Sequence, residues 1–229
     1  MLMESASWTP AQKELYTELV RAFLSRHSRG RRILAIDGPD GAGKTRFGDS
    51  LQVAFARANV EAFRASVDDF HHPREFRYRQ GPNSPRGYYQ DAFDYHQLQR
   101  VLLEPFRLGG STSFVTKAFD VQTDQPIAMK WESAGPDAVL IVDGVFLQRP
   151  VLKNEWNAVL WLEASEAERG RRMQARDGAH PLLTHPSHGR YQGAHAHYRE
   201  AVKPEEHATF LVDNTDWRAP RQYFPKFEF

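Results

Sequence analysis

The stretch Gly38-Pro39-Asp40-Gly41-Ala42-Gly43-Lys44-Thr45 decides the fold of this chain. It matches the pattern G-x-x-x-x-G-K-[ST], in which glycines let backbone N–H groups close around a phosphate. The apolar run 33–36 before it predicts a buried strand, and residues from about 44 to 58 have the spacing of a helix. We therefore interpret it as a phosphate-binding loop; the alternative is a glycine turn that only packs a helix against a strand.

The chemistry of such a loop assigns roles to its residues. The start of the following helix carries partial positive charge, which favours an anion there. Lys44 is expected to reach the β- and γ-phosphates of a nucleotide, and the Thr45 hydroxyl to bind magnesium. The predicted nucleotide-binding residues here are Gly38, Asp40, Gly41, Ala42, Gly43, Lys44, Thr45 and Arg46.

Short apolar runs alternate with helical patterns along the rest of the chain. This alternation predicts an α/β fold with three layers, in which helices cover both faces of a mostly parallel sheet. We expect residues 1–229 to form one domain with an N-terminal helical extension (1–30), a β-hairpin insertion (about 109–133) and a helical lid region (about 169–203). Strands are expected at 33–36, 60–67, 138–142, 158–162 and 210–212, and helices at about 9–28, 44–58, 93–103, 165–176 and 194–203.

Composition narrows the classes of protein. The 229 residues include 41% hydrophobic and 26% charged residues, which fits a folded soluble domain. A net charge of +1 gives no field for nucleic acid or an anionic membrane, so neither is an expected partner. The absence of cysteine excludes disulfides, iron–sulfur clusters and cysteine nucleophiles. The 23 arginines, against 7 lysines, suit phosphate recognition, although codon bias in a GC-rich genome also produces such an excess.

Location is inferred from the absence of targeting signals. No segment approaches the roughly 20 apolar residues of a membrane span. Residues 1–8 lack the basic and apolar regions of a signal peptide. We expect the protein in the cytoplasm.

Two acids follow predicted strands, where ligands bind in an open α/β sheet. Asp68, in Ser66-Val67-Asp68-Asp69-Phe70-His71, is placed to accept a proton from a substrate hydroxyl. Asp143 ends the apolar strand 138–142 and is expected to hold magnesium or its water shell. The alternative is that Asp68 is only solvated and that Asp69 caps a helix or loop. The chain has neither the N-K-x-D motif of GTPases nor the L-S-G-G-Q motif of ABC-type ATPases.

The predicted helix over 165–176 carries arginines on one face. Arg169, Arg172 and Arg176 have the spacing i, i+3, i+7, and a face of this kind above a phosphate would neutralise charge during transfer. A solvated charged face is the alternative. Five histidines follow between residues 180 and 197, and we favour a polar lid over a metal site because no pair has a recognised ligand spacing.

These motifs together resemble the uridine kinase family, within the wider group that includes phosphoribulokinase and bacterial pantothenate kinase. The resemblance extends from about residue 33 to 216 and rests on GPDGAGKT, SVDDFHH, DAFDY (91–95), LIVDGVFL (140–147), RRMQARD, the pair Tyr198 and Lys203-Pro204, and LVDN (211–214). It implies that Asp68 is the catalytic base, that Arg169, Arg172 and Arg176 are lid arginines, and that Asp213 lies beside the adenine.

Two positions depart from the family pattern. The ribose-binding Asp of the N-F-D-H-P segment corresponds to Tyr88, and the base-reading His of the hairpin corresponds to Asp124. A donor to a pyrimidine has therefore become an acceptor, and a site built on polar contacts rejects analogues that leave them unpaired. The predicted acceptor-binding residues are Asp68, Phe70, Arg79, Arg86, Tyr88, Tyr89, Phe119 and Asp124.

The sequence thus predicts an ATP- and Mg²⁺-dependent kinase of a small hydroxyl compound. Lys44, Asp68, Arg172 and Arg176 are its expected catalytic residues, and a nucleoside is the expected acceptor. A sugar, vitamin or cofactor precursor remains an alternative, since Arg77, Arg79 and Arg86 would suit pantothenate-like or phosphorylated-sugar acceptors. A P-loop ATPase or nucleotide-sensing protein without a small acceptor is the alternative from another class. Assembly into a homo-oligomer stays open.

Overall fold

The computed structural model describes residues 8–224. Residues 1–7, which carry most of the segment tested for a signal peptide, lie outside the described residues, as do 225–229. Among the described residues, none of the helices combines the length and hydropathy that a membrane span needs.

The centre of the molecule is a six-stranded sheet of order β10-β9-β8-β1-β7-β2. All neighbours are parallel except β10, which pairs antiparallel with β9. The innermost strands are buried along their whole length, as the apolar runs predict. The strands are β1 (Arg32–Asp37), β2 (Ala62–Ser66), β7 (Val139–Gly144), β8 (Ala158–Glu163), β9 (Phe210–Asp213) and β10 (Arg221–Gln222).

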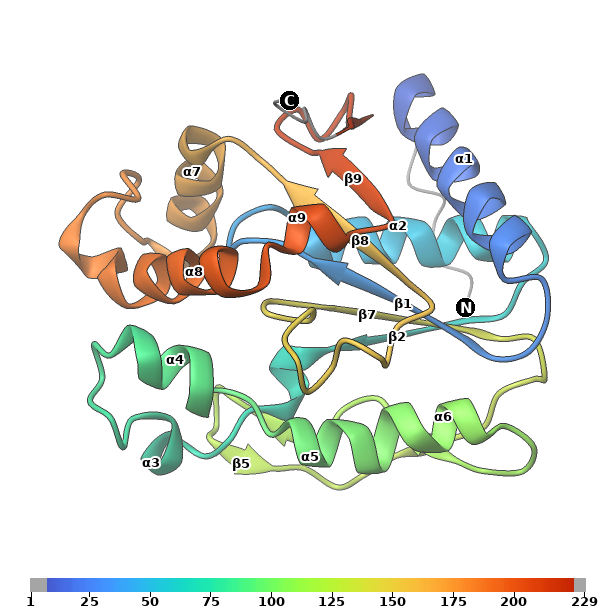
Figure 1. The fold of residues 1–229 in the computed structure, drawn as a ribbon, viewed down its shortest axis with the longest axis horizontal. Helices are drawn as coiled ribbons and strands as arrows, with labels where there is room; N and C mark the ends of the chain where they lie inside the picture. Colours follow the sequence, from blue (N-terminus) through green and yellow to red (C-terminus); the bar gives the residue numbers. More distant parts are fainter. Residues whose placement is uncertain (1–7, 225–229) are drawn as a thin grey trace.

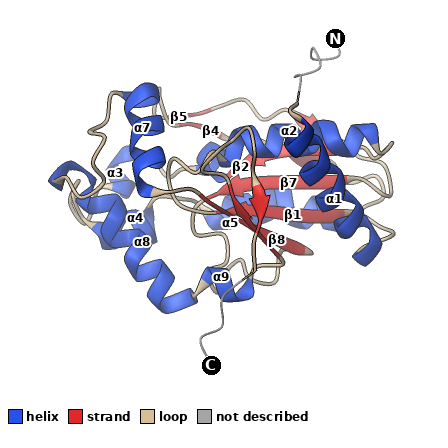
Figure 2. Cartoon of the chain, turned by 90° about the horizontal axis from the view of Figure 1, so that it is seen from above, coloured by secondary structure: helices blue, strands red, loops and turns tan. Residues whose placement is uncertain are grey.

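Helices cover both faces of this sheet, so the predicted three-layer α/β fold is confirmed (Figures 1 and 2). One core cluster joins the sheet to α1 (Pro10–Arg26) and α2 (Lys44–Arg57). The other joins the opposite face to α5 (Tyr95–Leu98), the π-helical turn Gln99–Leu103 and α6 (Glu104–Leu108). Helices α7 (Glu166–Asp177), α8 (Gly189–Val202) and α9 (Pro204–His207) lie between β8 and β9 in the chain.

The N-terminal helix α1 packs on α2 through aromatic pairs. The rings of Tyr16 and Phe47 lie 5.1 Å apart, and those of Phe23 and Phe55 lie 5.7 Å apart. Thr9 and Gln12 form the capping box that the sequence suggests. Gln12 also donates to the carbonyl of Trp217, so this helix connects the P-loop helix to the C-terminal part of the sheet.

Two segments differ from the expected pattern. The stretch 70–89, expected as loop, contains α3 (Arg74–Arg77) and α4 (Pro85–Asp91), and α4 begins with a Ser84 cap and Pro85 at its first position. The single helix expected over 93–103 is divided by the π-helical turn. Pro105 follows this turn and cannot donate to the helical ladder, which accounts for the change of register.

The insertion after α6 consists of two antiparallel pairs, one inside the other. Strand β3 (Phe114–Val115) pairs with β6 (Trp131–Glu132), and β4 (Phe119–Asp120) pairs with β5 (Gln125–Pro126). The turn contains Asp124 with a positive φ of 57°. The hairpin therefore carries Asp124 toward α3 rather than leaving it in solvent.

Candidate active site

The carboxyl ends of the parallel strands bring the predicted site residues to one edge of the sheet. The glycine loop follows β1, Asp68 follows β2, Asp143 lies near the end of β7, and Asp213 ends β9. Residues separated by more than 170 positions therefore meet, because parallel strands present their carboxyl ends on the same side.

Glycine is required at two positions of the loop by close contacts. Gly41 has a φ of 78°, and a Cβ there would lie 2.8 Å from the carbonyl oxygen of Arg169 on α7. Gly43 has a φ of 93°, and its Cβ would lie 2.9 Å from the side-chain nitrogen of Asn214. The loop is thus packed directly against α7 and the end of β9, and a side chain at either position would displace it.

Lys44 and Thr45 occupy the positions expected of a nucleotide site. The ammonium of Lys44 is buried in the curl of the loop, where it donates to the carbonyls of Gly38 (2.8 Å) and Pro39 (2.9 Å). The Thr45 hydroxyl lies 2.8 Å from Oδ2 of Asp143. These two oxygen donors are the types that Mg²⁺ prefers, so the pair fits the predicted metal role.

The other oxygen of Asp143 belongs to an ion pair that the sequence interpretation missed. Arg64, in β2, donates to Oδ1 of Asp143 at 2.7 Å and to the Thr45 carbonyl at 3.1 Å. Gly48 makes this possible, because a Cβ there would lie 2.4 Å from the guanidinium carbon. The signal was an arginine in the middle of a predicted strand, opposite a glycine one helical turn after Lys44.

Asp68 lies near these groups and is poised between two protonation states. Its side chain keeps contact with solvent, yet surrounding protein desolvates the carboxylate and raises its pKa to about 6. Lys44 opposes this rise, while the carboxylates of Asp143, Asp40 and Asp69 add to it. A carboxylate with a pKa near neutral pH is suited to proton transfer.

The arginines of α7 have three different surroundings, and Arg172 contacts the glycine loop and the residues that follow β9. Its guanidinium donates to the carbonyls of Ala42 (3.0 Å), Asn214 (2.7 Å) and Thr215 (3.1 Å), and to Glu168 (2.8 Å). With its donors directed at protein carbonyls, it braces the outer side of the loop.

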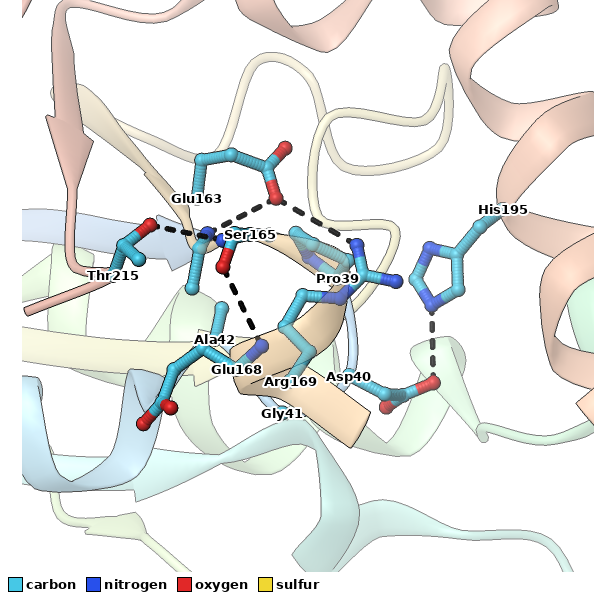
Figure 3. Close-up of polar contacts among 12 residues, drawn as sticks. Pro39, Asp40, Gly41, Ala42, Glu163, Ser165, Glu168, Arg169, His195 and Thr215 are labelled. Carbon is cyan, nitrogen blue, oxygen red and sulfur yellow. Dashed lines mark hydrogen bonds and ion pairs between the residues drawn. The ribbon is translucent and has the colours of Figure 1, made fainter. Parts of the chain in front are cut away.

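Arg169 is buried among protein groups, whereas Arg176 is exposed and its guanidinium donates to Asp177. The guanidinium of Arg169 is buried, with its Nη1 3.6 Å from Glu163 and its backbone against Gly41 (Figure 3). Arg176 is exposed beside Asp177, and it feels the charges of Asp40 and Asp68. Arg176 is therefore the α7 arginine that faces the predicted acidic site.

Helix α8 contacts the loop from the other side. Tyr198 donates to the buried Asp37 at the end of β1 (2.5 Å) and accepts from the backbone of Gln148 (2.9 Å). His195 lies 3.1 Å from Asp40 (Figure 3). These contacts join the lid region to the strand that precedes the loop, and the sequence offered no spacing that would have predicted them.

On the acceptor side, Asp124 is engaged by α3. Its carboxylate accepts from the guanidinium of Arg77 at 2.8 Å and from the backbone N–H of Arg74 at 2.9 Å. The charge of this acid is matched and its oxygens are occupied within the protein. It therefore fastens the hairpin to α3, and it cannot serve as a free acceptor for a substrate.

The other predicted arginines of this region are engaged as well. Arg79 pairs with the buried Asp91 at 2.6 Å, and its guanidinium stacks on Phe76. Arg86 is exposed and donates to Gln90 at 3.0 Å. One nitrogen of each guanidinium therefore has a protein partner, and acceptor binding by these side chains stays a prediction.

Two predicted acceptor residues are in the core. Phe70 is fully buried and Phe119 is 4% exposed, so neither ring offers a surface to a ligand. Tyr88 and Tyr89 lie on α4 beside Phe146, with ring centroids 5.4 and 5.2 Å from it. Of the two, Tyr89 is buried and Tyr88 is half-buried.

The remaining predicted residues fall at the margins. Arg46 is exposed on α2. Asp213 accepts from the N–H of Thr215 at 2.9 Å and shapes the turn after β9. In the lid region His180 and His185 stack with centroids 4.0 Å apart, and within residues 8–224 no group of three or more His, Cys, Asp or Glu side chains is arranged to hold a metal.

Comparison with known proteins agrees with this geometry at the level of the fold. No protein-family model and no curated protein matches the sequence. A structure from Bacillus stearothermophilus described as a possible uridine kinase superposes with a TM-score of 0.69 at 21% identity, covering 87% of this chain and 97% of that one. A protein from Silicibacter sp. TM1040, provisionally named a fructose transport system kinase, has a TM-score of 0.62 at 24% identity, with coverage of 82% and 94%.

A third structure is more distant. The D-glycerate 3-kinase of Cryptococcus neoformans has a TM-score of 0.51 at 12% identity, covering 93% of this chain and 99% of that one. These proteins bear names of kinases with different acceptors. The chain therefore has the P-loop kinase-like α/β fold, and the likeness leaves the acceptor to be argued from the site.

Proposed function

We propose that the protein is an ATP-dependent kinase that transfers the γ-phosphoryl group to a hydroxyl of a small uncharged molecule, with a nucleoside as the preferred class. The observation that carries this proposal is the position of Asp68, whose raised pKa of about 6 occurs beside Lys44 at the carboxyl edge of the sheet. A carboxylate at this place can accept the proton of an acceptor hydroxyl.

The proposed reaction uses groups already described. The acceptor hydroxyl attacks the γ-phosphorus, its proton passes to the carboxylate of Asp68, and the bond to the β-phosphate oxygen breaks to release ADP. Lys44 and Arg176 place positive charge where negative charge accumulates. Arg172 and Asn214 act indirectly, since both bind the carbonyl of Ala42 and hold the loop in shape.

The donors present are compatible with Mg²⁺. Thr45 and Asp143 would hold the ion or its water shell, with Arg64 orienting the second oxygen of the acid. When bound, the ion would supply neutralisation of the β- and γ-phosphate charge.

The acceptor is proposed to be uncharged because two of the arginines that the sequence offered to an anionic acceptor are paired with acids. Arg77 is paired with Asp124 and Arg79 with Asp91. An anionic acceptor would instead meet the carboxylates of Asp40 and Asp68. The negative charge of these two carboxylates would repel a negatively charged acceptor. It therefore disfavours the pantothenate-like and phosphorylated acceptors that the arginine-rich sequence had suggested.

The test is ADP release from ATP, measured with and without uridine, cytidine, adenosine, D-ribose, D-fructose, D-glycerate or pantothenate. We expect turnover that depends on a neutral acceptor, preferably a nucleoside, and no response to the two carboxylates. Acceptor-independent hydrolysis would instead support an ATPase. The Asp68→Asn variant is the matched control, because it should bind ATP and lose the acceptor-dependent rate.

A further inference from the structure

An acidic side chain within the phosphate-binding loop requires an explanation. Asp40 is the third residue of the glycine motif, and its carboxylate is 28% exposed. Burial alone would raise the pKa of this acid, but the hydrogen bond and charge of His195, with the charges of Lys44 and Arg176, lower it below its usual range. The carboxylate is therefore ionised, and an ionised acid aimed at a triphosphate would repel it.

The structure instead turns Asp40 toward α8. Its Oδ2 lies 3.1 Å from Nε2 of His195, whose side chain is 9% exposed (Figure 3). The imidazole is itself positioned by Phe146, with ring centroids 5.0 Å apart. Asp40 is thus held on the side of the loop that faces the lid and α4.

Aromatic residues from α4 and α8 surround that side. The rings of Tyr88 and Tyr191 lie 4.9 Å apart, and Tyr88 also contacts Phe146 at 5.4 Å. The two helices approach closely, since a Cβ at Gly193 would lie 2.8 Å from Pro85. Burial, followed by the charges of Asp40 and Asp68, raises the pKa of the Tyr88 hydroxyl well above its usual value, so both acids act electrostatically on this tyrosine.

Asp68 and Asp40 have pKa values that are shifted in opposite directions. The pKa of Asp68 is raised to about 6, whereas that of Asp40 is lowered. Environments that separate two carboxylates in this manner assign one to proton transfer and keep the other ionised. A carboxylate that remains ionised accepts hydrogen bonds and does not donate them.

We propose that Asp40, positioned by His195, is a specificity-determining residue that accepts a hydrogen bond from a second hydroxyl of the acceptor. This inference rests on the proposed kinase function and narrows it to acceptors with at least two hydroxyls. Asp91 on α4 and Asp124 in the hairpin turn are already paired with arginines. Asp40 therefore supplies the acidic contact at a site where Tyr88 replaces the aspartate of the family pattern.

The first test separates the nucleotide side from the acceptor side. Asp40→Ala and Asp40→Asn are compared with the wild-type chain and with Glu18→Gln, an exposed acid on α1. With uridine as the probe, we expect Asp40→Ala to raise the acceptor KM about 10- to 100-fold, as for loss of a charged hydrogen bond. The affinity for mant-ATP should stay within about twofold, because Oδ2 of the carboxylate is bonded to His195 on α8. A tenfold or greater loss of mant-ATP affinity in both Asp40 variants would overturn the assignment.

The second test uses acceptors that lack one hydroxyl. The wild-type chain should prefer uridine over 2′-deoxyuridine or 3′-deoxyuridine by about tenfold or more, and Asp40→Ala should lose that preference for one of them. His195→Ala should raise the acceptor KM by a smaller factor and have no further effect in the Asp40→Ala background. The proposal is contradicted if Asp40→Ala keeps the full preference for uridine over both deoxyuridines. It is also contradicted if the effects of Asp40→Ala and His195→Ala on the acceptor KM are fully additive.

Failure of the kinase proposal would be recognised separately. If none of the neutral acceptors supports turnover by the wild-type chain, the kinase function fails, while mant-ATP affinity still decides on which side of the loop Asp40 acts. Thermal unfolding of each variant identifies a loss caused by misfolding. In that case Asp40→Asn, which preserves the shape of the side chain, replaces Asp40→Ala in both tests.

Discussion

The proposed phosphate-binding region and the proposed acceptor-binding region of this protein are built differently. The first is a continuous segment, residues 38–45, in which backbone N–H groups would supply most of the contacts with a phosphate. The second is assembled from α4, the hairpin turn, α8 and the loop after β2, which are far apart in the sequence. In the first region, Arg172 and Arg64 donate to backbone carbonyls of the loop. In the second region, Arg77 and Arg79 form ion pairs with acids.

This difference explains why one region is recognisable and the other is not. Backbone N–H groups bind a phosphate in the same way whatever the neighbouring side chains are, so the loop needs only its glycines and Lys44. An acceptor is recognised by side chains that must converge from several elements. Their pairing, such as Arg77 with Asp124, changes with each contact that is gained or lost.

The largest effect is expected from removing Lys44. Lys44→Ala should lower kcat/KM by about 10³-fold or more, because the lysine charge acts on phosphates in a site with little water. The affinity for mant-ATP, measured by fluorescence titration, should fall as well. Exposed Lys13 on α1 gives the control substitution. Unchanged nucleotide affinity in Lys44→Ala would remove the basis for a phosphate-binding region.

Asp68 provides the next largest effect. Asp68→Asn should lower kcat by about 10²- to 10⁴-fold without weakening ATP binding, since only the proton acceptor is removed. The base works when deprotonated, so kcat/KM should fall as pH is lowered through about 6, and the variant should lose this limb. A pH–rate profile with the best acceptor tests both statements. An acid limb that persists in Asp68→Asn would assign it to another group.

Two arginines of the same helix should separate chemistry from architecture. Arg176→Ala should lower kcat by about 10²- to 10³-fold with little change in Tm, because its charge faces Asp40 and Asp68 while its side chain is exposed. Arg172→Ala should destabilise the fold by about 3 kcal/mol, since it leaves loop carbonyls without donors.

Kinetics together with thermal unfolding distinguish the two cases. A loss of about 3 kcal/mol lowers the Tm of a domain of this size by about 6–12 °C. The Arg172→Lys variant should be little more stable than Arg172→Ala, because an ammonium group cannot reproduce the planar arrangement of guanidinium donors. If Arg172→Ala lost turnover while keeping its Tm, this arginine would act on the phosphoryl group as the sequence suggested.

The smallest effect is expected at the hairpin. Asp124→Asn should weaken the contact with Arg77 and α3, and so raise the acceptor KM by a few-fold while leaving kcat and mant-ATP affinity unchanged. A partly exposed pair contributes little to stability, so Tm should barely shift. Asp49→Asn, which weakens an exposed pair with Arg64, is a comparable surface change near the nucleotide. A large loss of kcat in Asp124→Asn would indicate that this acid contacts the acceptor, as the sequence predicted.

Much of the fold could be predicted because its determinants are local. The apolar runs of β1, β7, β8 and β9 are long enough to identify buried parallel strands, and Thr9 with Gln12 identifies the start of α1. The segment 70–89 was harder to interpret. Its helices are short, and they are stabilised by caps and by contact with α8 rather than by a long amphipathic pattern.

The sequence by itself determined the phosphate-binding loop, the order of strands and helices, and the acids that follow the strands. Each depends on neighbours in the chain, through backbone conformation and hydrophobic periodicity. Only the tertiary structure decided which charged groups face a ligand. Arg172 donates to the carbonyl of Ala42, 130 positions away, and Asp124 is paired with Arg77, 47 positions away. Asp40 is turned to His195, 155 positions away. The charge of a side chain is written in the sequence, but its availability depends on what the fold places within hydrogen-bond distance.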